Sequence, residues 1–416
     1  MYSVRLQNMN NALHFTRFIT EQFGQTEAKR RIGKMAAAYS TGADSSFPAC
    51  FVRGGTSNGL MIRREHLPPD IKDWQPILAS AMGSPDHYGR QLNGMGSGIS
   101  STSKICVVEK SKRPDIDVDY TFVQVGIKDG SLDTAGNCGN MTSAVGPYAL
   151  NEQISPSCNM GDEEGGISKA TMRLFNVNTS KVIHSTFPVT KSPSIQFVPH
   201  GNYSIDGVPG RASHIVLSFV DPEGARTGKA LPTSNVVDTL ELPDGTTMQA
   251  TLTDIANPGV FVLASDLGID GAIPPAALEA NATLMARLEA IRQAGASLMG
   301  LDPNTQSVPK IVILSKPSET LASEGVNIVC RALSMQQAHK AAPLTLALNL
   351  GASCSISGTL MAKTAVGLEA GKENSSVLIA HASGKLEVGS VRKNGKIESA
   401  LLHRTARIMM KGDVFY

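Results

Sequence analysis

The sequence predicts an α+β fold with mostly antiparallel or mixed sheet. Short runs of β-branched and apolar residues alternate with turns, and 39 glycines and 22 prolines among 416 residues suit many closely spaced turns. The regular alternation of strand and helix that a doubly wound sheet requires is missing. A chain of this length is expected to form about two domains.

Each element is predicted from its pattern of apolar residues. In chain order, strands are expected within 51–62, where a glycine-rich loop separates two of them, then at 105–108, at 118–127, twice within 172–188, at 214–220, at 385–392 and, after a hairpin turn at Asn394-Gly395, within 396–410. A buried helix is expected after Cys138, a longer one over 275–300, and another after Met335.

Composition excludes several classes of function. The formal net charge is +2 and 18% of residues are charged, which argues against binding to nucleic acid or to an anionic membrane. No apolar run approaches the ~20 residues that a membrane-spanning helix needs. The six cysteines form no Cys-x-x-Cys pair, which argues against a zinc site and a disulfide framework and for a reducing compartment such as the cytoplasm.

Residues 1–46 are predicted to be an extension outside the fold. The first 20 residues include Arg5 and Arg17 and contain no acid. This composition is compatible with a mitochondrial presequence, but a flexible extension is the favoured interpretation.

Two segments carry reactive side chains beside small polar residues. The segment Asp133-Thr-Ala-Gly-Asn-Cys138-Gly-Asn140 places a thiol just before the expected buried helix, where main-chain N–H groups favour thiolate and attract carboxylates. The segment Gly94-Met-Gly-Ser-Gly-Ile-Ser-Ser-Thr-Ser-Lys104 ends in a lysine at the start of an apolar strand. A thiol and an amine in such settings indicate proton transfer on a small anionic substrate.

Six motifs follow one another along the chain: Arg53-Gly-Gly-Thr-Ser-Asn-Gly59, Met82-Gly-Ser-Pro-Asp86, Gly94-Met-Gly96, Ser100-Ser-Thr-Ser-Lys104, Gly136-Asn-Cys-Gly-Asn140 and Arg331-Ala-Leu-Ser-Met335. Together they resemble the PrpF family of 2-methylaconitate, aconitate and methylitaconate isomerases. The resemblance implies the fold of diaminopimelate epimerase: two similar domains, each a curled sheet around a central helix, with the active site in the cleft between them. It divides the chain into a first domain of residues 47–200 plus 386–416 and a second domain of residues 201–385.

The resemblance also implies the site. Lys104 and Cys138 would transfer the protons, without a cofactor or a metal ion. Substrate contacts are expected from Thr56, Ser57, Asn58, Met95, Gly96, Ser97, Ser103, Gly139, Asn140, Asn257, Arg331, Met335 and His339. The partner is a small polycarboxylate, with neither nucleic acid nor membrane involved, and a homodimer is compatible with the sequence.

Two positions depart from the related patterns. The epimerases carry a second cysteine eight residues after an arginine; here His339 stands eight residues after Arg331, which argues against two-thiol racemisation. Asn58 stands where the family loop often has lysine, and it matches the epimerase pattern instead. The sequence leaves open whether His339 is a helix cap, a core residue or a substrate contact. It also leaves open whether Arg331 binds a carboxylate or has a structural role.

The predicted chemistry moves a carbon–carbon double bond in an aconitate-like acid. One group removes a proton from carbon, fixed donors hold the dienolate charge, and a second group returns a proton two carbons away. Which of Lys104 and Cys138 is the base stays open, because an anionic substrate and a helix terminus act on them in opposite directions. The alternatives are an epimerase or racemase of the same fold and a non-catalytic binding module.

Overall fold

The computed structural model describes residues 45–416, apart from short gaps at 135–136, 156–157, 192–193, 306–307 and 335. The described chain forms two compact units. The smaller one joins residues 45–48 to Asp413–Tyr416, where the rings of Phe47 and Tyr416 lie 5.6 Å apart. The larger one, Ala49–Gly412, contains every described residue that the sequence assigns to the site.

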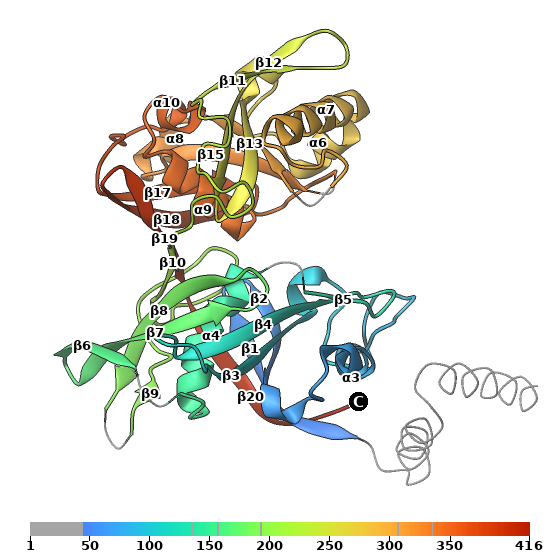
Figure 1. Ribbon diagram of the computed structural model, residues 1–416, viewed down its shortest axis with the longest axis vertical. Helices are drawn as coiled ribbons and strands as arrows, with labels where there is room; N and C mark the ends of the chain where they lie inside the picture. Colours follow the sequence, from blue (N-terminus) through green and yellow to red (C-terminus); the bar gives the residue numbers. More distant parts are fainter. Residues whose placement is uncertain (1–44, 135–136, 156–157, 192–193, 306–307, 335) are drawn as a thin grey trace, which may run out of the picture. The chain divides into compact units, whose positions relative to one another are not determined.

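We refer to residues 46–220 as the α4 half, after the helix α4 (Gly139–Asn151) at its centre (Figure 1). Its strands are β1 (Ser46–Gly54), β2 (Ser57–Arg63), β3 (Lys104–Lys110), β4 (Val118–Val125), β5 (Leu132–Asp133), β6 (Asn159–Glu164), β7 (Ile167–Asn176), β8 (Lys181–Thr190), β9 (Gln196–Phe197) and β10 (Ile215–Val220). It also contains α3 (Trp74–Met82) and single 3-10 turns at Arg64–His66, Ile71–Asp73 and Ser100–Thr102.

We refer to residues 221–393 as the α9 half, after the helix α9 (Leu344–Ser353). Its strands are β11 (Asp238–Glu241), β12 (Thr247–Ile255), β13 (Asn257–Leu263), β14 (Lys310–Ser315), β15 (Ile328–Ser334), β16 (Gln337–Ala338), β17 (Asn374–His381) and β18 (Gly384–Lys393). Its further helices are α5 (Ala264–Leu267), α6 (Pro275–Ala280), α7 (Ala282–Leu298), α8 (Glu319–Ser323) and α10 (Leu360–Thr364).

The helix α4 is buried on all sides because its sequence is small and apolar all round. Every residue from Met141 to Leu150 is buried. A helix without a polar face must be enclosed by protein. Strands β2, β3, β4, β7, β8 and β10 contact it, and their inward side chains form one core with it. This enclosure holds the N-terminal end of α4 beside the end of β1, where Gly54 approaches Asn140.

The two halves repeat one pattern of strand pairing. In the α4 half, β1–β2 is antiparallel, β2–β3 parallel, β3–β4 antiparallel, β4–β7 parallel and β7–β8 antiparallel. In the α9 half, β12–β13, β13–β14, β14–β15, β15–β17 and β17–β18 follow the same order of directions. Helix α9 packs against β12, β13, β17 and β18. The predicted likeness of the two parts of the chain therefore appears in their topology.

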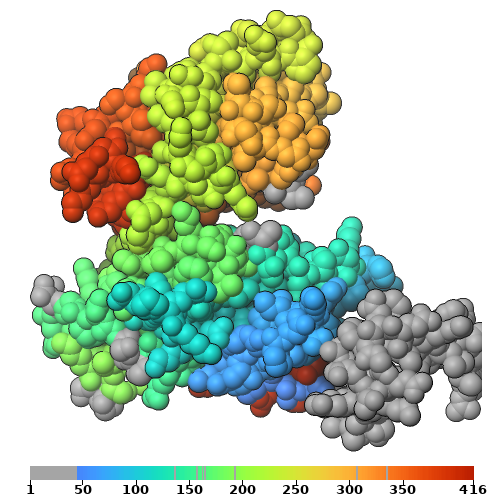
Figure 2. Space-filling view, in the orientation of Figure 1, coloured from blue at the N-terminus to red at the C-terminus, as the bar shows by residue number. Residues whose placement is uncertain are grey.

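The helix expected over 275–300 is two helices. Residue Asn281 separates α6 from α7 and accepts a hydrogen bond from the Leu284 N–H through its side chain, at 3.0 Å. Asparagine caps helix starts well, so this residue begins a new helix where the apolar spacing alone indicated continuity. Together with β11–β14, α7 forms a second core, and these segments lie side by side in the space-filling view (Figure 2).

The C-terminal strands β19 (Lys396–Arg404) and β20 (Ala406–Phe415) follow the turn at Asn394-Gly395. Both turn residues have positive φ, +51° and +81°, as the predicted hairpin requires. Strand β19 pairs with β18 on one edge and with β10 on the other, and β20 pairs with β1. The strand expected over 396–410 is therefore interrupted at Thr405.

The predicted mixed α+β architecture is confirmed, while the division at residues 200 and 386 stays a prediction. The extension predicted for residues 1–46 lies almost entirely outside the described residues. In the part of the chain that the structure describes, no helix is both long and apolar enough to cross a membrane.

Candidate active site

Lys104 is the first residue of β3, between Gly59 of β2 and Gln124 of β4. Lys104 is only 8% exposed, although lysine is rarely buried in proteins. The amine donates to Gln124 Oε1 at 2.5 Å and lies 5.3 Å from the centre of the Phe122 ring. Because Gln124 Nε2 donates to the Ser103 carbonyl at 2.9 Å, the amide presents its oxygen to the amine. The strand edge thus holds Lys104 in one orientation.

Gln91 anchors the glycine-rich loop that supplies three predicted site residues, Met95, Gly96 and Ser97. Its side chain is fully buried; Nε2 donates to Ser103 Oγ at 2.6 Å and Oε1 accepts from the Gly98 N–H at 3.0 Å. A Cβ on Gly96 would lie 2.3 Å from Gln91 Oε1, so only glycine permits this approach. The loop is therefore tied to the residue that precedes Lys104.

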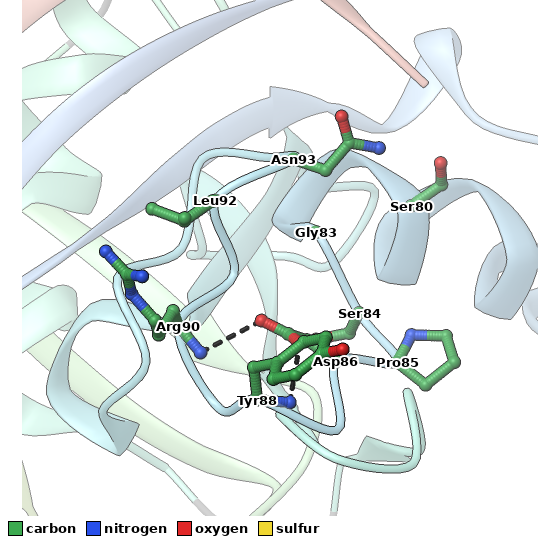
Figure 3. A pocket seen from close by; sticks show the side chains of 9 residues that line it. All are labelled: Ser80, Gly83, Ser84, Pro85, Asp86, Tyr88, Arg90, Leu92 and Asn93. Atoms are coloured by element: carbon green, nitrogen blue, oxygen red, sulfur yellow. Dashed lines mark hydrogen bonds between the residues drawn. The ribbon is translucent and has the colours of Figure 1, made fainter.

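Asp86 orders the beginning of the same loop (Figure 3). Its carboxylate accepts from the main-chain N–H groups of Tyr88 at 2.8 Å, Arg90 at 2.9 Å and Gln91 at 2.6 Å. These bonds lower the pKa of the Asp86 carboxyl, which stays charged at neutral pH. The lining of the open hollow of about 510 Å³ beside it includes neither Lys104 nor Cys138. We assign Asp86 a structural role.

Cys138 is the N-cap residue of α4 and is partly buried. Its carbonyl accepts from the Thr142 N–H at 2.9 Å and from Thr142 Oγ1 at 3.0 Å. No described side chain caps the start of the helix, so its first N–H groups remain available to an anion. Burial raises the pKa of the neighbouring Cys106 thiol; the charge of Cys138 acts in the same direction and that of Lys104 in the opposite one. Cys138 packs against the core that contains Cys106, and Gly59, opposite Lys104, lies close to Met141 in the first turn of α4.

The side chain of Asn140 joins the first turn of α4 to the loop between β1 and β2. Its Nδ2 donates to Thr56 Oγ1 at 3.0 Å and to Ser57 Oγ at 3.5 Å, and its Oδ1 accepts from the Thr56 N–H at 3.3 Å. A Cβ on Gly54 would lie 2.3 Å from the Asn140 carbonyl oxygen. The glycine in this loop is what lets the two segments approach.

Arg404 is a residue that the sequence reasoning missed. It ends β19, is 6% exposed, and donates from Nε to Asn140 Oδ1 at 3.1 Å and from Nη1 to the His403 carbonyl at 2.8 Å. Burial lowers the pKa of its guanidinium to about 10, and the charges of Tyr203 and Cys138 oppose this shift. A cation therefore lies beside Cys138 and the open end of α4. Its only signal in the sequence is an arginine at an inward position of an alternating strand, where the other buried residues are apolar or small.

In the α9 half, Asn257 is positioned from the central helix. The fully buried Asn349 of α9 donates from Nδ2 to the carbonyls of Thr253 at 2.9 Å and Asn257 at 2.8 Å. The Asn257 Nδ2 atom is buried and has no hydrogen-bond partner among the described residues. Helix α9 contacts α4, and a Cβ on Gly139 would lie 3.3 Å from a methyl carbon of Leu344. The two helix starts thus lie against each other.

Other predicted site residues lie elsewhere or have different contacts. Arg331 is buried and donates to the carbonyls of Ile273, Ala272 and Cys330, at 2.7, 2.8 and 2.9 Å. His339 is exposed, and its N–H donates to the Ala332 carbonyl at 2.9 Å. Asn58 is a partly buried residue of β2. Met335 lies outside the described residues.

The structure thus brings part of the predicted set together. Gly59 lies between Lys104 and the first turn of α4, which Cys138 caps, and Gln91 attaches the loop of residues 95–97 through Ser103. Asn140 gathers Thr56 and Ser57 at the start of α4, where Gly139 meets α9. Among the described residues, no group of three or more His, Cys, Asp and Glu side chains is arranged to bind a metal ion.

Comparison with known proteins identifies the family. Residues 45–416 match the family model described as PrpF protein. The chain is 36% identical over 390 residues to the 2-methyl-aconitate isomerase of Cupriavidus necator, with 88% of this chain and 96% of the relative covered. It is 34% identical over 383 residues to the 3-methylitaconate isomerase of Eubacterium barkeri, with the same coverage.

A third relative and one solved structure agree with this. The (4E)-oxalomesaconate Delta-isomerase of Novosphingobium sp. (strain KA1) is 37% identical over 373 residues, covering 89% of this chain and 97% of the relative. The crystal structure of a methylitaconate-delta-isomerase superposes with a TM-score of 0.76 at 32% identity, covering 89% of this chain and 96% of that one. The chain belongs to the PrpF family.

Proposed function

We propose that the chain is an isomerase that moves a carbon–carbon double bond in an unsaturated di- or tricarboxylate of the aconitate type. The observation that carries this proposal is that the start of β3 and the first turn of α4 both lie against Gly59, so that Lys104 and Cys138 come from neighbouring segments: a Cβ on Gly59 would lie 2.1 Å from the Lys104 carbonyl oxygen and 3.1 Å from Met141 Cε. Both are positioned by buried main chain: Lys104 begins β3 and Cys138 caps α4. The named isomerase activities of the relatives support the same reaction class.

The reaction is two proton transfers with no net change in composition. One of the pair removes a proton from a carbon next to a carboxylated double bond, and the electrons spread into a dienolate. The other returns a proton to the carbon two positions away, and the double bond ends one position along. This needs no redox step, and it is efficient where acid and base lie within reach of the carbons. Reversing the reaction exchanges the roles of base and acid within the pair, so the same two residues serve both directions.

The negative charge of the dienolate would be held at the start of α4. The first N–H groups of the helix, from Gly139 onward, have no side-chain cap among the described residues. Arg404 adds a buried cation that Asn140 keeps in place. Fixed donors and a cation in a poorly hydrated place stabilise developing charge more than water does. We therefore add Arg404 to the substrate-binding residues predicted from the sequence.

The site would lie in a cleft between two similar domains, residues 47–200 plus 386–416 and residues 201–385. Support comes from the repeated strand pairing and from the contact of Gly139 with Leu344 at the start of α9. In the described residues, neither central helix has a side-chain cap at its N-terminal end. Two uncapped helix ends side by side suit a substrate with two or three carboxylates.

The test is isotope exchange in heavy water. The purified chain is incubated with trans-aconitate, 2-methylaconitate and itaconate-type acids without added cofactor, and proton NMR follows the signals of the carbons flanking the double bond. We expect deuterium to enter one of these acids, with isomer appearing at a comparable rate. A full panel of unsaturated di- and tricarboxylates without exchange would refute the proposal. Exchange at a saturated α-carbon of an amino acid would indicate an epimerase instead.

A further inference from the structure

Lys310 occupies in the α9 half the position that Lys104 occupies in the α4 half. Each is the first residue of a strand that pairs in parallel with its neighbour, and each stands opposite a glycine, Gly59 for Lys104 and Gly259 for Lys310. Strand β14 then continues as an apolar run, as β3 does. The repeat thus supplies a second lysine that the reacting pair does not use.

The side chain of Lys310 lines a cavity of about 330 Å³. This volume is near the lower limit of the ~300–1,000 Å³ typical of ligand pockets and suits a small organic acid. Three basic residues, Lys181, Arg226 and Lys310, line it together with a single acidic residue, Asp133. The charge of the lining therefore favours an anion.

The cavity adjoins the proposed reacting site. Its lining includes Asn137, which precedes Cys138, and Thr345, the second residue of α9. It also includes Asn257, whose buried Nδ2 has no partner among the described residues. An unpaired buried donor is unfavourable in the folded chain, which makes it a natural contact for a ligand oxygen. The main chain of Asn257 is itself held in place, because its carbonyl accepts a hydrogen bond from Asn349.

The amine of Lys310 is itself poorly solvated. Burial lowers its pKa to about 8, so it is still mainly charged at neutral pH. A weakly hydrated ammonium gains more from a carboxylate partner than one in open water, because the interaction is screened less. Electrostatics thus agrees with the geometry of the cavity.

We propose that Lys310 and Asn257 bind a carboxylate remote from the migrating double bond, and that this contact makes the enzyme prefer tricarboxylates to dicarboxylates. The proposal rests on the isomerase function proposed above. Lys310 would give the charge and Asn257 a neutral N–H, while Lys104 and Cys138 act at the carbons. A dicarboxylate lacks the third carboxylate and cannot make this contact in addition to those at the reacting carbons.

The test measures binding with saturated acids, which the enzyme cannot turn over. Titration calorimetry compares tricarballylate with glutarate on the wild-type chain, Lys310→Met and Lys310→Arg. We expect Lys310→Met to weaken tricarballylate binding at least tenfold and glutarate binding less than threefold. Lys310→Arg keeps the charge and should stay within about threefold for both. Lys363→Met, an exposed lysine on α10, is the matched control and should change neither value.

Three outcomes would overturn the inference. Lys310→Met could bind tricarballylate as tightly as the wild type, or it could bind both acids equally weakly. The wild type could also bind two tricarballylate molecules, with Lys310→Met losing only the second. The last would make the cavity a separate anion site. If the wild-type chain binds neither acid and also fails the heavy-water experiment, the isomerase function itself is refuted. Circular dichroism of each variant shows that the fold is retained, and Asn257→Ala offers a second route, with the same expected selectivity.

Discussion

The amine of Lys104 donates to Gln124 Oε1 at 2.5 Å, across the first pair of residues that joins β3 to β4. The amide of Gln124 is itself held by the Ser103 carbonyl. A lysine side chain has four rotatable bonds, and ordering it costs up to about 2 kcal/mol in side-chain entropy. Here that ordering is already present before a substrate arrives. The proposed acid–base group is therefore positioned by a neutral partner that leaves its proton available.

Lys104→Ala should abolish isomerisation while the chain remains folded. A general acid–base group typically contributes about 10²–10⁴ in rate, so we expect a loss of at least ~10²-fold in kcat. Ultraviolet absorbance of the unsaturated acid measures the rate. Lys110→Ala, at the exposed far end of the same strand, is the control. Activity of Lys104→Ala within about threefold of the wild type would remove Lys104 from the mechanism.

Gln124→Leu should lower kcat about tenfold or more and leave KM within about threefold, because Gln124 positions the amine and does not contact the substrate. The measurement is the steady-state rate at several pH values. Gln124→Glu keeps an acceptor oxygen and should retain more activity than Gln124→Leu. Equal losses in both variants, with KM rising, would indicate a direct substrate contact.

Cys138→Ser should lose most activity, since a hydroxyl is a far weaker acid than a thiol. Iodoacetamide should modify Cys138 in the free enzyme, and a bound polycarboxylate should slow that reaction. Mass spectrometry locates the modified cysteine, and the buried Cys330 and Cys354 serve as internal controls. Full alkylation at Cys138 with activity intact would show that this assignment is wrong.

Arg404→Lys should raise the Kd for tricarballylate by about tenfold, because lysine cannot reproduce the planar fork that holds Asn140 and faces an anion. The comparison is Arg331→Lys, at the arginine that the sequence placed in the site. Arg331 donates to three main-chain carbonyls. We therefore expect Arg331→Lys to lower the melting temperature and to change the Kd for tricarballylate little. Reversal of this pattern would restore Arg331 as the carboxylate ligand.

Lys310→Met should stabilise the chain at pH 7 by about 1–3 kcal/mol. Burial lowers the pKa of the folded-state amine from 10.5 to about 8, so below pH 8 the charged amine is penalised only in the folded state. As pH rises from 8 to 10.5 the folded state loses its proton first, and the penalty disappears. Denaturant unfolding at pH 7 and pH 10 measures the difference. A gain that is larger at pH 10 would contradict the assigned cause.

Local pattern predicted much of the fold. Alternating apolar residues identified β4, β7, β8 and β10, and the buried run after Cys138 identified α4, because these features depend on neighbours in sequence. The same spacing failed at Asn281, where a capping side chain interrupts a helix that apolar periodicity alone would continue. The short amphipathic helix α3 was not expected either, because the glycine and proline residues that follow it indicate a loop.

The site was predicted only where its residues are close in sequence. Cys138, Gly139 and Asn140 fall in one motif, and Lys104 ends another. Arg404 lies 264 residues from Asn140, and no periodicity links them. Lys310 was likewise passed over, because its significance appears only when the pairing of β13 with β14 is compared with that of β2 with β3. Both depend on how distant strands pair, which single-sequence patterns do not contain.

The last strands of the chain have a consequence for biosynthesis. Arg404 bonds to Asn140, and the Thr405 carbonyl accepts from the Gly55 N–H at 2.9 Å, so the beginning of the fold is completed by its end. On the ribosome, the strands around α4 emerge long before β19 and stay incomplete until it has been synthesised. Until then the apolar surface around α4 stays open to other chains. Nascent chains of this protein should thus depend on chaperones, and activity should appear only after β19 has left the ribosome.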